Sequence, residues 1–390
     1  MKRIVICCDG TWNRLDADRP TNVARIAKAI LPRAPDGIVQ VIRHIDGVGT
    51  GRGVGPVSQA ADRALGGLFG RGLMATLADA YRFLIFNYAP GDEIYLFGFS
   101  RGAFTARSLS GLIRNCAIPQ ARHAAEIGAA LGLYRRRSAG THPDADVACG
   151  FRARVAPHVS IGEADASWRA ARGVAPGHPL RLRYVGVWDT VGALGVPSHI
   201  ATLQWLNRGL RFHDTRLSRG VDAARQAVAI DERRRVFPPA LWDNLDALNA
   251  ETDGPARREQ RWFPGDHGAV GGGGEPRLSN DALLWVAEGA MAEGLALDPH
   301  CLAEWSRDRD CLAPLPRARG ALAAFLNLSR RDRTGPDRID DLAAASLARW
   351  RGDPRWRPGA LRRVRHLLGG DASPPSCHWR TEPGALGDPA

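Results

Sequence analysis

The stretch DEIYLFGFSRGAFTARSLSGLIRN, residues 92–115, holds a Gly-x-Ser-x-Gly pentapeptide between two contrasting patterns. The apolar run Glu93–Phe97 before it is typical of a buried strand. From Ala103 onward, apolar residues recur at the spacing of one helix face. Ser100 therefore lies where a strand turns into a helix. This context predicts a nucleophile elbow, a strained turn that exposes the serine hydroxyl at the end of the strand.

Two glycines beside Ser100 support this interpretation. Gly98 and Gly102 lack the Cβ atoms that would collide where the backbones of strand and helix approach each other. The helix that begins near Arg101 adds N–H donors and a dipole that favour negative charge beside the serine. The alternative is a serine that stands between two glycines by chance, because the pentapeptide alone is a weak signal.

The residues before this stretch alternate between strand and helix patterns. Short apolar or β-branched runs at 4–8 and 38–45 predict strands, while helix patterns follow a cap at Thr21 and span 73–88. Such alternation is typical of an α/β fold with a mostly parallel sheet and helices on both of its faces. We therefore expect an α/β-hydrolase-like fold built around Ser100.

After Ile118 the periodicity weakens. Residues 119–179 hold one clear helix pattern, at 123–137, followed by sequence rich in proline and glycine. We expect a cap-like insertion here, between the nucleophile helix and the strand that carries the acid. A surface insertion without a role is the alternative. The predicted domains are an α/β-hydrolase catalytic domain over 1–300 and a basic, mainly helical C-terminal extension over 301–390.

A serine nucleophile needs a base, and the base needs an acid that orients it. In this fold the acid and then the base follow the serine along the chain. Asp189 comes directly after the predicted strand 181–188 and is the expected acid, with an Asx turn as its alternative role. His267, in a Pro-Gly-Asp-His-Gly loop at a strand end, is the expected base. His213, in Phe-His-Asp-Thr, is its rival.

An oxyanion hole needs two N–H donors near the serine. The residue after the nucleophile, Arg101, is the expected first donor. The second is expected from the loop after the first strand, where Gly10 and Thr11 lie, with Asp9 bracing that loop.

Nothing in the sequence calls for a metal or an organic cofactor. The seven cysteines are scattered without metal-ligand spacing, and their odd number argues against a disulfide framework. The glycine cluster 47–55 lacks the spacings of nucleotide-binding loops, so it is interpreted as a loop of another kind. No apolar run reaches about 18 residues, which argues against a membrane span. A cytoplasmic location is expected by default, with signal-less export as the alternative.

The formal net charge of +12 raises the question of a nucleic-acid or acidic-membrane partner. Of the 53 basic residues only Lys2 and Lys28 are lysines, and the chain is rich in alanine, glycine and proline, as GC-rich coding produces. Because no nucleic-acid-reading motif is recognisable, we expect no nucleic-acid partner. Peripheral membrane contact through the basic stretch 355–365 stays open. The sequence does not predict the oligomeric state.

Eight segments, taken in order, resemble one known family. They are CCDGTWN, PTNVARIAKAI, GVGTG, DAYRFLIFNYAPGDEIYLFGFSRGAFTARSLSGLIRN, VGVWDTVGALGVP, FHDTRLS, AIDERRRVFPPALW and WFPGDHGAVGGG. The chain is similar to a family of uncharacterised α/β-hydrolase domains that includes the catalytic domains of type VI secretion phospholipase effectors. The resemblance runs from Lys2 to about Leu368, and GFSRGA with GVWDTVGALG is its most specific pair.

The resemblance implies a catalytic triad of Ser100, Asp189 and His267 that cleaves ester bonds without a cofactor. The substrates of the secreted members are phospholipids. We therefore expect a serine hydrolase of the (phospho)lipase type that works through an acyl-enzyme. The alternatives are hydrolysis of a small soluble ester or thioester, and a non-catalytic binding copy of the fold.

One departure from the family pattern falls beside the expected base. Where the family usually has Ser-Asp after this histidine, the chain has Gly268 and Ala269. The binding-copy alternative rests on this change, because the missing carboxylate would otherwise support the histidine loop. The three triad residues are intact, so activity is expected.

Overall fold

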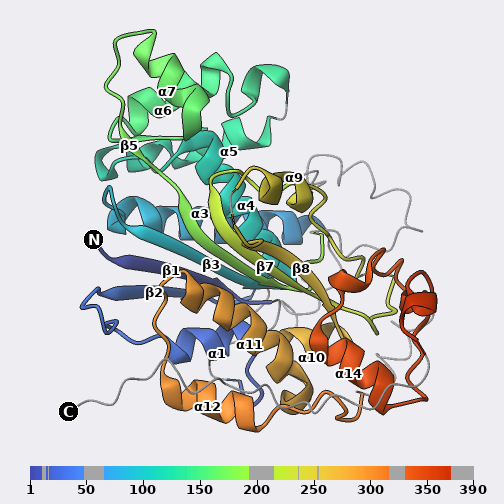
Figure 1. The fold of residues 1–390 in the computed structure, drawn as a ribbon. Coiled ribbons are helices and arrows are strands. Elements are labelled where there is room, and N and C mark those ends of the chain that lie inside the picture. The colour runs from blue at the N-terminus through green and yellow to red at the C-terminus, as the bar shows by residue number, and fades with distance from the viewer. Residues whose placement is uncertain are drawn as a thin grey trace.

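The computed structural model describes residues 1–10, 15, 17–47, 66–136, 138–192, 215–235, 237–252, 254–315 and 330–369. Within these ranges a six-stranded sheet lies between two layers of helices (Figure 1). The predicted α/β fold, with a parallel sheet covered on both faces, is confirmed.

The sheet consists of β1 Arg3–Cys8, β2 Gln40–Ile45, β3 Glu93–Phe99, β6 Leu182–Trp188, β7 Val221–Ala229 and β8 Arg258–Phe263. The strands lie in the order β2-β1-β3-β6-β7-β8, and each neighbouring pair is parallel. All carboxyl ends therefore meet at one edge of the sheet, where open α/β sheets build their sites.

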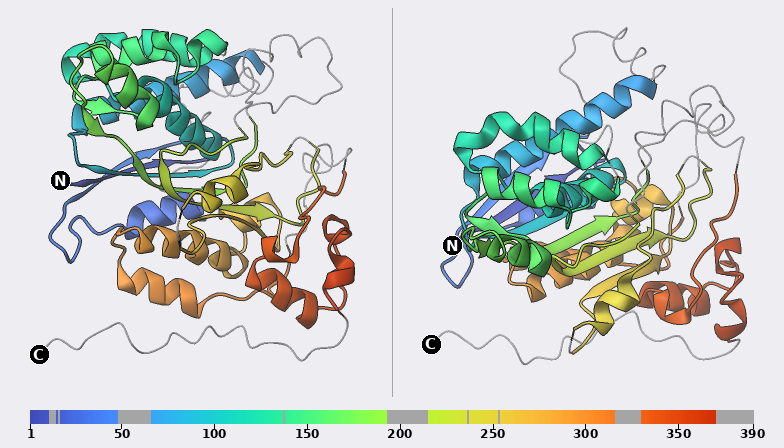
Figure 2. Two further views of the ribbon diagram at one scale, coloured as in Figure 1. Left: turned by 45° about the horizontal axis from the view of Figure 1, so that its top comes forward. Right: turned by 90° about the horizontal axis from the view of Figure 1, so that it is seen from above.

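Helices cover both faces of the sheet (Figure 2). One face carries α3 (Gly66–Asn87) and α4 (Arg101–Cys116). The other carries α1 (Asn22–Ala29) and α11 (Pro276–Ala292), with α12 (Pro299–Arg307) packed beside α11.

Strand β1 shows how both layers are held. Ile4 and Ile6 are buried in the apolar core on the side of α3 and α4. Val5 and Cys7 alternate with them and are buried in the core on the side of α1 and α11. A parallel strand covered on both faces has no polar side, which explains the continuous apolar run in the sequence.

The insertion after α4 is a small helical layer. Its elements are η1 Ala121–Glu126, α5 Ile127–Arg135, η2 Ala139–Thr141, α6 Asp146–Val155, β4 Val159–Ser160, α7 Gly162–Ala170 and β5 His178–Pro179. It packs on α3 and α4, and the side chain of Asn115 donates to Thr141 O at 3.0 Å. At 1.5 Å per residue, Asn115 is about 20 Å along α4 from Ser100. The insertion, green in Figure 1, thus contacts the end of α4 that lies away from the serine, and its role as a cap stays a prediction.

Residues 330–369 pack against the β8 side of the sheet, at the opposite end of the molecule from the insertion (Figures 1 and 2). Trp350, Trp356 and Val364 share a buried core with Val228 of β7 and Trp262 of β8. The apolar side chains of this region therefore pack against the sheet, whereas the arginines of the basic stretch 355–365 are exposed. Membrane contact through them and the domain division at residue 300 stay predictions. This region contains η4 Ile339–Asp341, α14 Ala344–Gly352, η5 Gly359–Leu361 and η6 Arg365–Leu367.

Two short helices flank β8 in sequence: α9 Leu245–Ala250 precedes its amino end, and α10 His267–Gly271 follows its carboxyl end. Among the described residues, no helix is long and apolar enough to cross a membrane.

Candidate active site

Ser100 lies in a strained turn between β3 and α4. Its backbone angles are φ 56° and ψ −122°, a conformation that residues with a side chain rarely adopt. Its N–H donates to Trp188 O at 3.1 Å. A Cβ on Gly98 would lie 2.5 Å from Gly102 O, and a Cβ on Gly102 would lie 2.1 Å from Cys8 O of β1. The turn therefore requires both glycines, the second one because β1 passes close to α4.

Asp189 follows the last residue of β6, the strand that pairs directly with β3. It has a positive φ of 37° and no solvent exposure. Its N–H donates to Ala227 O at 2.7 Å, and its Oδ1 accepts the Ala229 N–H at 2.9 Å. Both bonds join it to β7, so the carboxylate has a defined orientation at the carboxyl edge of the sheet.

His267 is the first residue of α10. Its N–H donates to Glu232 Oε2 at 3.2 Å, and its imidazole lies near two aromatic rings. The Phe237 ring stacks on it with centroids 4.8 Å apart, and the Phe99 ring lies 4.6 Å away in a tilted arrangement. A Cβ on Gly271 would lie 1.9 Å from the Phe99 ring. The glycine that ends this short helix thus lets the loop close against β3.

The structure brings Ser100, His267 and Asp189 together. His267 Nε2 lies 2.8 Å from Ser100 Oγ, and His267 Nδ1 lies 2.6 Å from Asp189 Oδ2. All three side chains are buried. When the Nδ1 proton is donated to the carboxylate, Nε2 is left to accept the serine hydroxyl. Such an arrangement is able to take the proton of Ser100 while its oxygen attacks an electrophilic carbon.

Arg333 completes this arrangement, and the sequence patterns did not indicate it. Its Nη1 donates to Asp189 Oδ1 at 2.6 Å and its Nη2 donates to Asp189 Oδ2 at 2.9 Å. Arg333 is itself buried, with 6% exposure. A forked pair of this kind is the strongest contact that arginine makes with a carboxylate. The only available signal was an arginine in the segment RRDRTGPDR, which has no strand or helix pattern.

Arg333 decides the charge of Asp189. Burial alone would raise the pKa of this carboxyl group. The positive charge of Arg333 and the hydrogen bonds from His267 and Arg333 outweigh burial and hold the pKa well below its ordinary value. Asp189 is therefore an anion throughout the physiological pH range.

A second set of carboxylates supports the loop around His267. Glu232 accepts the His267 N–H and pairs with Arg234 at 2.6 Å; burial opposes its charge, but Arg234 still keeps the pKa of Glu232 below its ordinary value. Asp231 accepts the Gly265 N–H at 2.7 Å, and Asp266 caps α10. Burial raises the pKa of both Asp231 and Asp266.

Of the residues predicted for an oxyanion hole, the structure describes Gly10 and Arg101, together with the supporting residue Asp9. Gly10 N–H donates to Asp9 Oδ1 at 2.7 Å, and the Thr21 hydroxyl donates to the same carboxylate at 2.9 Å. Asp9 thus braces this loop and occupies the Gly10 N–H. Arg101 is the first residue of α4, and burial lowers the pKa of its side chain to about 10. Thr11 lies outside the described residues.

Two other sequence features also fall outside the described ranges. His213 lies in the undescribed stretch 193–214, and most of the glycine cluster lies in 48–65. Among the described residues, no group of three or more histidine, cysteine, aspartate or glutamate side chains could hold a metal ion.

The two positions at which this chain departs from the family pattern, Gly268 and Ala269, have different surroundings. Ala269 is fully buried and contacts Leu278 and Ala313, and its N–H donates to Asp266 Oδ1 at 2.9 Å. For a Cβ on Gly268 the nearest atom is Asp266 Oδ1 at 3.7 Å, which is ordinary contact. Position 268 therefore has room for a serine, while position 269 is closed by apolar neighbours.

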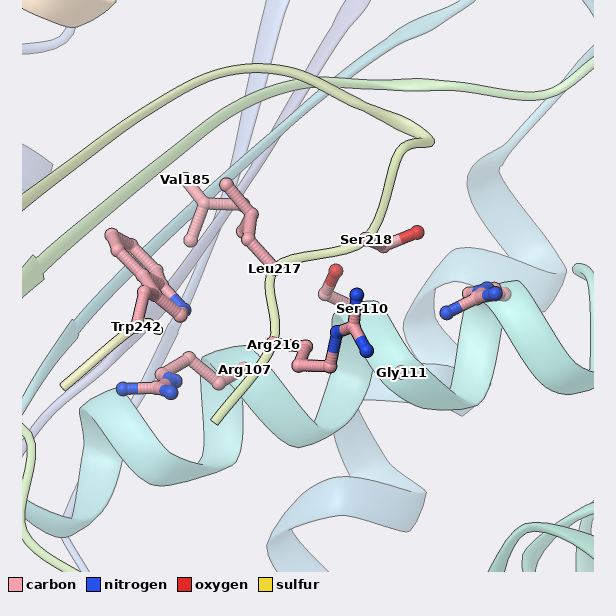
Figure 3. Close-up of a pocket in the computed structure, with 9 residues that line it drawn as sticks. Arg107, Ser110, Gly111, Val185, Arg216, Leu217, Ser218 and Trp242 are labelled. Atoms are coloured by element: carbon pink, nitrogen blue, oxygen red, sulfur yellow. The ribbon is translucent and has the colours of Figure 1, made fainter. Parts of the chain in front are cut away.

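Basic cavities lie beside α4. Figure 3 shows one of about 20 Å³, lined by Arg107, Arg216 and Trp242 among others. An adjoining cavity of about 400 Å³ shares Arg114 and Arg216 with it, and no carboxylate is among its lining residues. Ser100, His267 and Asp189 line neither cavity.

Comparisons with known proteins give distant relatives. An uncharacterized protein of Saccharomyces cerevisiae is 25% identical over 244 residues, which are 60% of this chain and 32% of that protein. The chain thus spans about a third of the length of this curated relative.

Two solved structures are similar over most of this chain. A crystal structure of an uncharacterized protein from Pseudomonas aeruginosa has 18% identity and a TM-score of 0.40, covering 78% of this chain and 48% of that one. A structure of the Tle1 effector bound to the VgrG spike of the type 6 secretion system has 15% identity and a TM-score of 0.39, covering 84% and 83%.

A family profile decides the relationship. It matches residues 2–289, nearly three quarters of the chain, and it confirms the resemblance inferred from the eight sequence segments. The chain belongs to the family of type VI secretion phospholipase effector, Tle1-like, catalytic domains.

Proposed function

We propose that this protein is a serine hydrolase that cleaves carboxylic ester bonds of phospholipids. The single observation that carries the proposal is the unbroken hydrogen-bonded series from Ser100 through His267 to Asp189. Membership of a phospholipase effector family supports a lipase-type substrate.

The proposed reaction has two halves. His267 Nε2 takes the Ser100 proton while Oγ bonds to the ester carbonyl carbon, and Asp189 stabilises the imidazolium that forms. The tetrahedral intermediate then expels the alcohol, which receives the proton from His267, and leaves an acyl-enzyme. Water repeats these steps: it gives a proton to His267, attacks the acyl carbon, and releases the acid and Ser100. We assign the Arg101 N–H, at the start of α4, as one oxyanion donor.

The decisive test is labelling of the purified chain with a fluorophosphonate probe. Wild type is expected to be labelled, and Ser100→Ala is expected to lose all labelling. Ser110→Ala, a buried serine on the same helix, is the matched control and should be labelled like wild type. Labelling that survives in Ser100→Ala, or a folded wild type that is never labelled, would refute the proposal.

A substrate series then separates the two ester-hydrolase alternatives. Turnover that rises with acyl length and with presentation in vesicles favours a phospholipase. A preference for short soluble p-nitrophenyl esters, with no release of fatty acid from vesicles, favours a small-ester hydrolase.

We further propose that the cavity lined by Arg114 and Arg216 contacts anionic lipid headgroups. Neither arginine forms an ion pair within the described part of the chain, and they flank a space without carboxylates. The test is sedimentation with phosphatidylglycerol vesicles. The pair Arg114→Ser and Arg216→Ser should weaken binding several-fold, whereas Arg219→Ser, whose arginine already pairs with Glu251 at 2.5 Å, should not. Equal binding by all variants would rule this contact out.

The family name also bears on location. We propose that the protein acts outside the producing cell after delivery by type VI secretion. The measurement is its appearance in the medium of a strain with an active secretion apparatus and its absence when the apparatus is disabled.

A further inference from the structure

Arg333 is held in place by more than its ion pair with Asp189. Its Nη1 also donates to Ala229 O at 2.8 Å, and its Nη2 also donates to Phe237 O at 2.9 Å. These carbonyl oxygens belong to the end of β7 and to the residue whose ring stacks on His267. The plane of the guanidinium is therefore set by the same elements that set the carboxylate and the imidazole.

The segment that carries Arg333 is anchored along residues 231–235. Arg331 N–H donates to Arg233 O at 2.8 Å, and Arg330 forms an antiparallel bridge with Arg234. The Arg233 side chain pairs with Asp332 at 2.8 Å. Because Glu232 of the same stretch accepts the His267 N–H, one piece of backbone positions both the arginine and the histidine.

The two oxygens of Asp189 have different partners. Oδ1 accepts from Ala229 N–H and Arg333 Nη1, whereas Oδ2 accepts from Arg333 Nη2 and His267 Nδ1. The forked contact therefore stops the carboxylate from rotating and leaves one lone pair of Oδ2 facing the imidazole. Without Arg333, a carboxylate at this buried position would have no cation within hydrogen-bonding distance among the described residues while His267 is neutral, because Arg234 is paired with Glu232.

We propose that Arg333 is a positioning residue of the active site, which holds the Asp189 carboxylate toward His267 and sets the acidic limit of activity. The inference rests on the proposed serine hydrolase function. It also assigns a role to residues beyond the family match, which ends at residue 289. Arg333 then completes the site, while the segment that carries it is anchored on residues 231–235.

The effect on pH follows from charge. In wild type the positive charge of Arg333 offsets the negative charge of Asp189, so the pair attracts a protonated His267 only weakly. In a variant without Arg333 the carboxylate faces the imidazole alone and favours its protonation. At about 5 Å and an effective dielectric constant of about 20, this difference corresponds to about two pH units. The acid limb of the kcat/KM profile should therefore move to higher pH in the variant.

Other charged groups face the imidazole and stay unchanged in this comparison. They are Glu232, which is paired with Arg234, and Asp266 at the start of α10. Because these groups are common to wild type and variant, the shift reports the loss of Arg333.

The experiment measures ester hydrolysis by the full chain from about pH 5 to 9. The variants are Arg333→Met, Arg333→Lys and the control Arg331→Met, which alters an exposed arginine of the same segment. In Arg333→Met the plateau of kcat/KM should fall about ten- to a hundredfold and the acid limb should rise by about one unit or more. Arg333→Lys keeps the charge but not the forked geometry, so its plateau should fall while its acid limb stays near wild type. Arg331→Met should match wild type.

Each other outcome overturns the inference. A folded Arg333→Met protein with an unshifted acid limb would make Arg333 a structural residue only. If Arg333→Met does not fold, Arg333→Lys decides, and a wild-type plateau in that variant would refute the positioning role. Failure of the proposed function has a different signature, because wild type would then show neither turnover nor probe labelling at any pH.

Discussion

Two buried aspartates in this protein have nearly the same surroundings but differ in one hydrogen-bond partner. In the insertion, Asp165 of α7 has no solvent exposure and pairs with Arg152 at 2.9 Å and with Arg169 at 3.2 Å. At the edge of the sheet, Asp189 is equally buried and pairs with Arg333. Each carboxylate also accepts a backbone N–H.

The difference lies in the last partner. Among the described residues, the donors to Asp165 are two arginines and the Ile161 N–H, and the charge of none of them changes. Asp189 shares one oxygen with His267, whose charge changes when it takes a proton. A buried carboxylate held by permanent donors stiffens a fold, whereas one that includes a histidine among its donors can stabilise a charge that appears only during a reaction. Substitutions at the two sites test this contrast.

The largest effect is expected when each acid becomes an amide. Asp189→Asn should lower kcat by about 10⁴-fold, because an amide cannot hold the required tautomer of His267. Asp165→Asn should leave kcat per folded molecule within about twofold of wild type. The measurement is active-site titration followed by steady-state kinetics. A similar loss of kcat in both variants would abolish the distinction between the two sites.

In the insertion, a substitution should lower stability and leave the catalytic rate unchanged. Arg152→Met leaves Asp165 with one cation where it had two, and the free energy of unfolding should fall by about 3–5 kcal/mol. The rate per folded molecule should not change, because the insertion lies at the far end of α4. Urea unfolding and kinetics on the same samples give both quantities. Lost activity at unchanged stability would show that the insertion communicates with the site.

A third buried carboxylate can be created without an arginine. Ala269→Asp restores the usual family residue among apolar neighbours and should lower stability by about 1–3 kcal/mol. Gly268→Ser, the other family residue, should change stability by less than about 0.5 kcal/mol, because its Cβ makes only an ordinary contact, with Asp266 Oδ1 at 3.7 Å. The melting temperatures of the two variants, compared with wild type, test both expectations. A stabilised Ala269→Asp variant would mean that this loop provides a partner for the acid.

Acid conditions should produce the smallest effect. The pKa of Asp189 is depressed in the folded state, so its ion pair contributes stability above the ordinary aspartate pKa of about 3.9, and this contribution is lost as pH falls further. The gap in unfolding free energy between wild type and Arg333→Met should be constant near neutrality and should narrow below about pH 4. Denaturant unfolding at a series of pH values measures it. A gap that widens toward acid would contradict the sign of the pKa shift.

The three hydrogen-bonded site residues could be predicted from the sequence because each follows the end of a strand. Ser100, Asp189 and His267 come directly after β3, after β6 and shortly after β8, and parallel strands place such positions at one edge. The glycines around Ser100 were also interpretable, since close backbone contact is a local property. The close approach of β1 to Gly102 could not be predicted, because it depends on the order of the strands in the sheet.

Arg333 could not be predicted from the same patterns. It lies 144 residues after Asp189 and outside any regular element, so no periodicity places it. The position of the insertion was equally hidden, because its helices are short and their apolar faces are set by α3 and α4. Contacts between distant segments are decided by packing, which a single sequence does not display.

The contact between Arg333 and Asp189 has a consequence for the order in which the protein is made. A ribosome that adds about 5–20 residues per second makes the serine turn roughly ten to fifty seconds before the arginine emerges. During that interval the nascent chain already holds its nucleophile but not the group that orients its acid. On the proposed mechanism, full activity therefore waits for translation of the later segment.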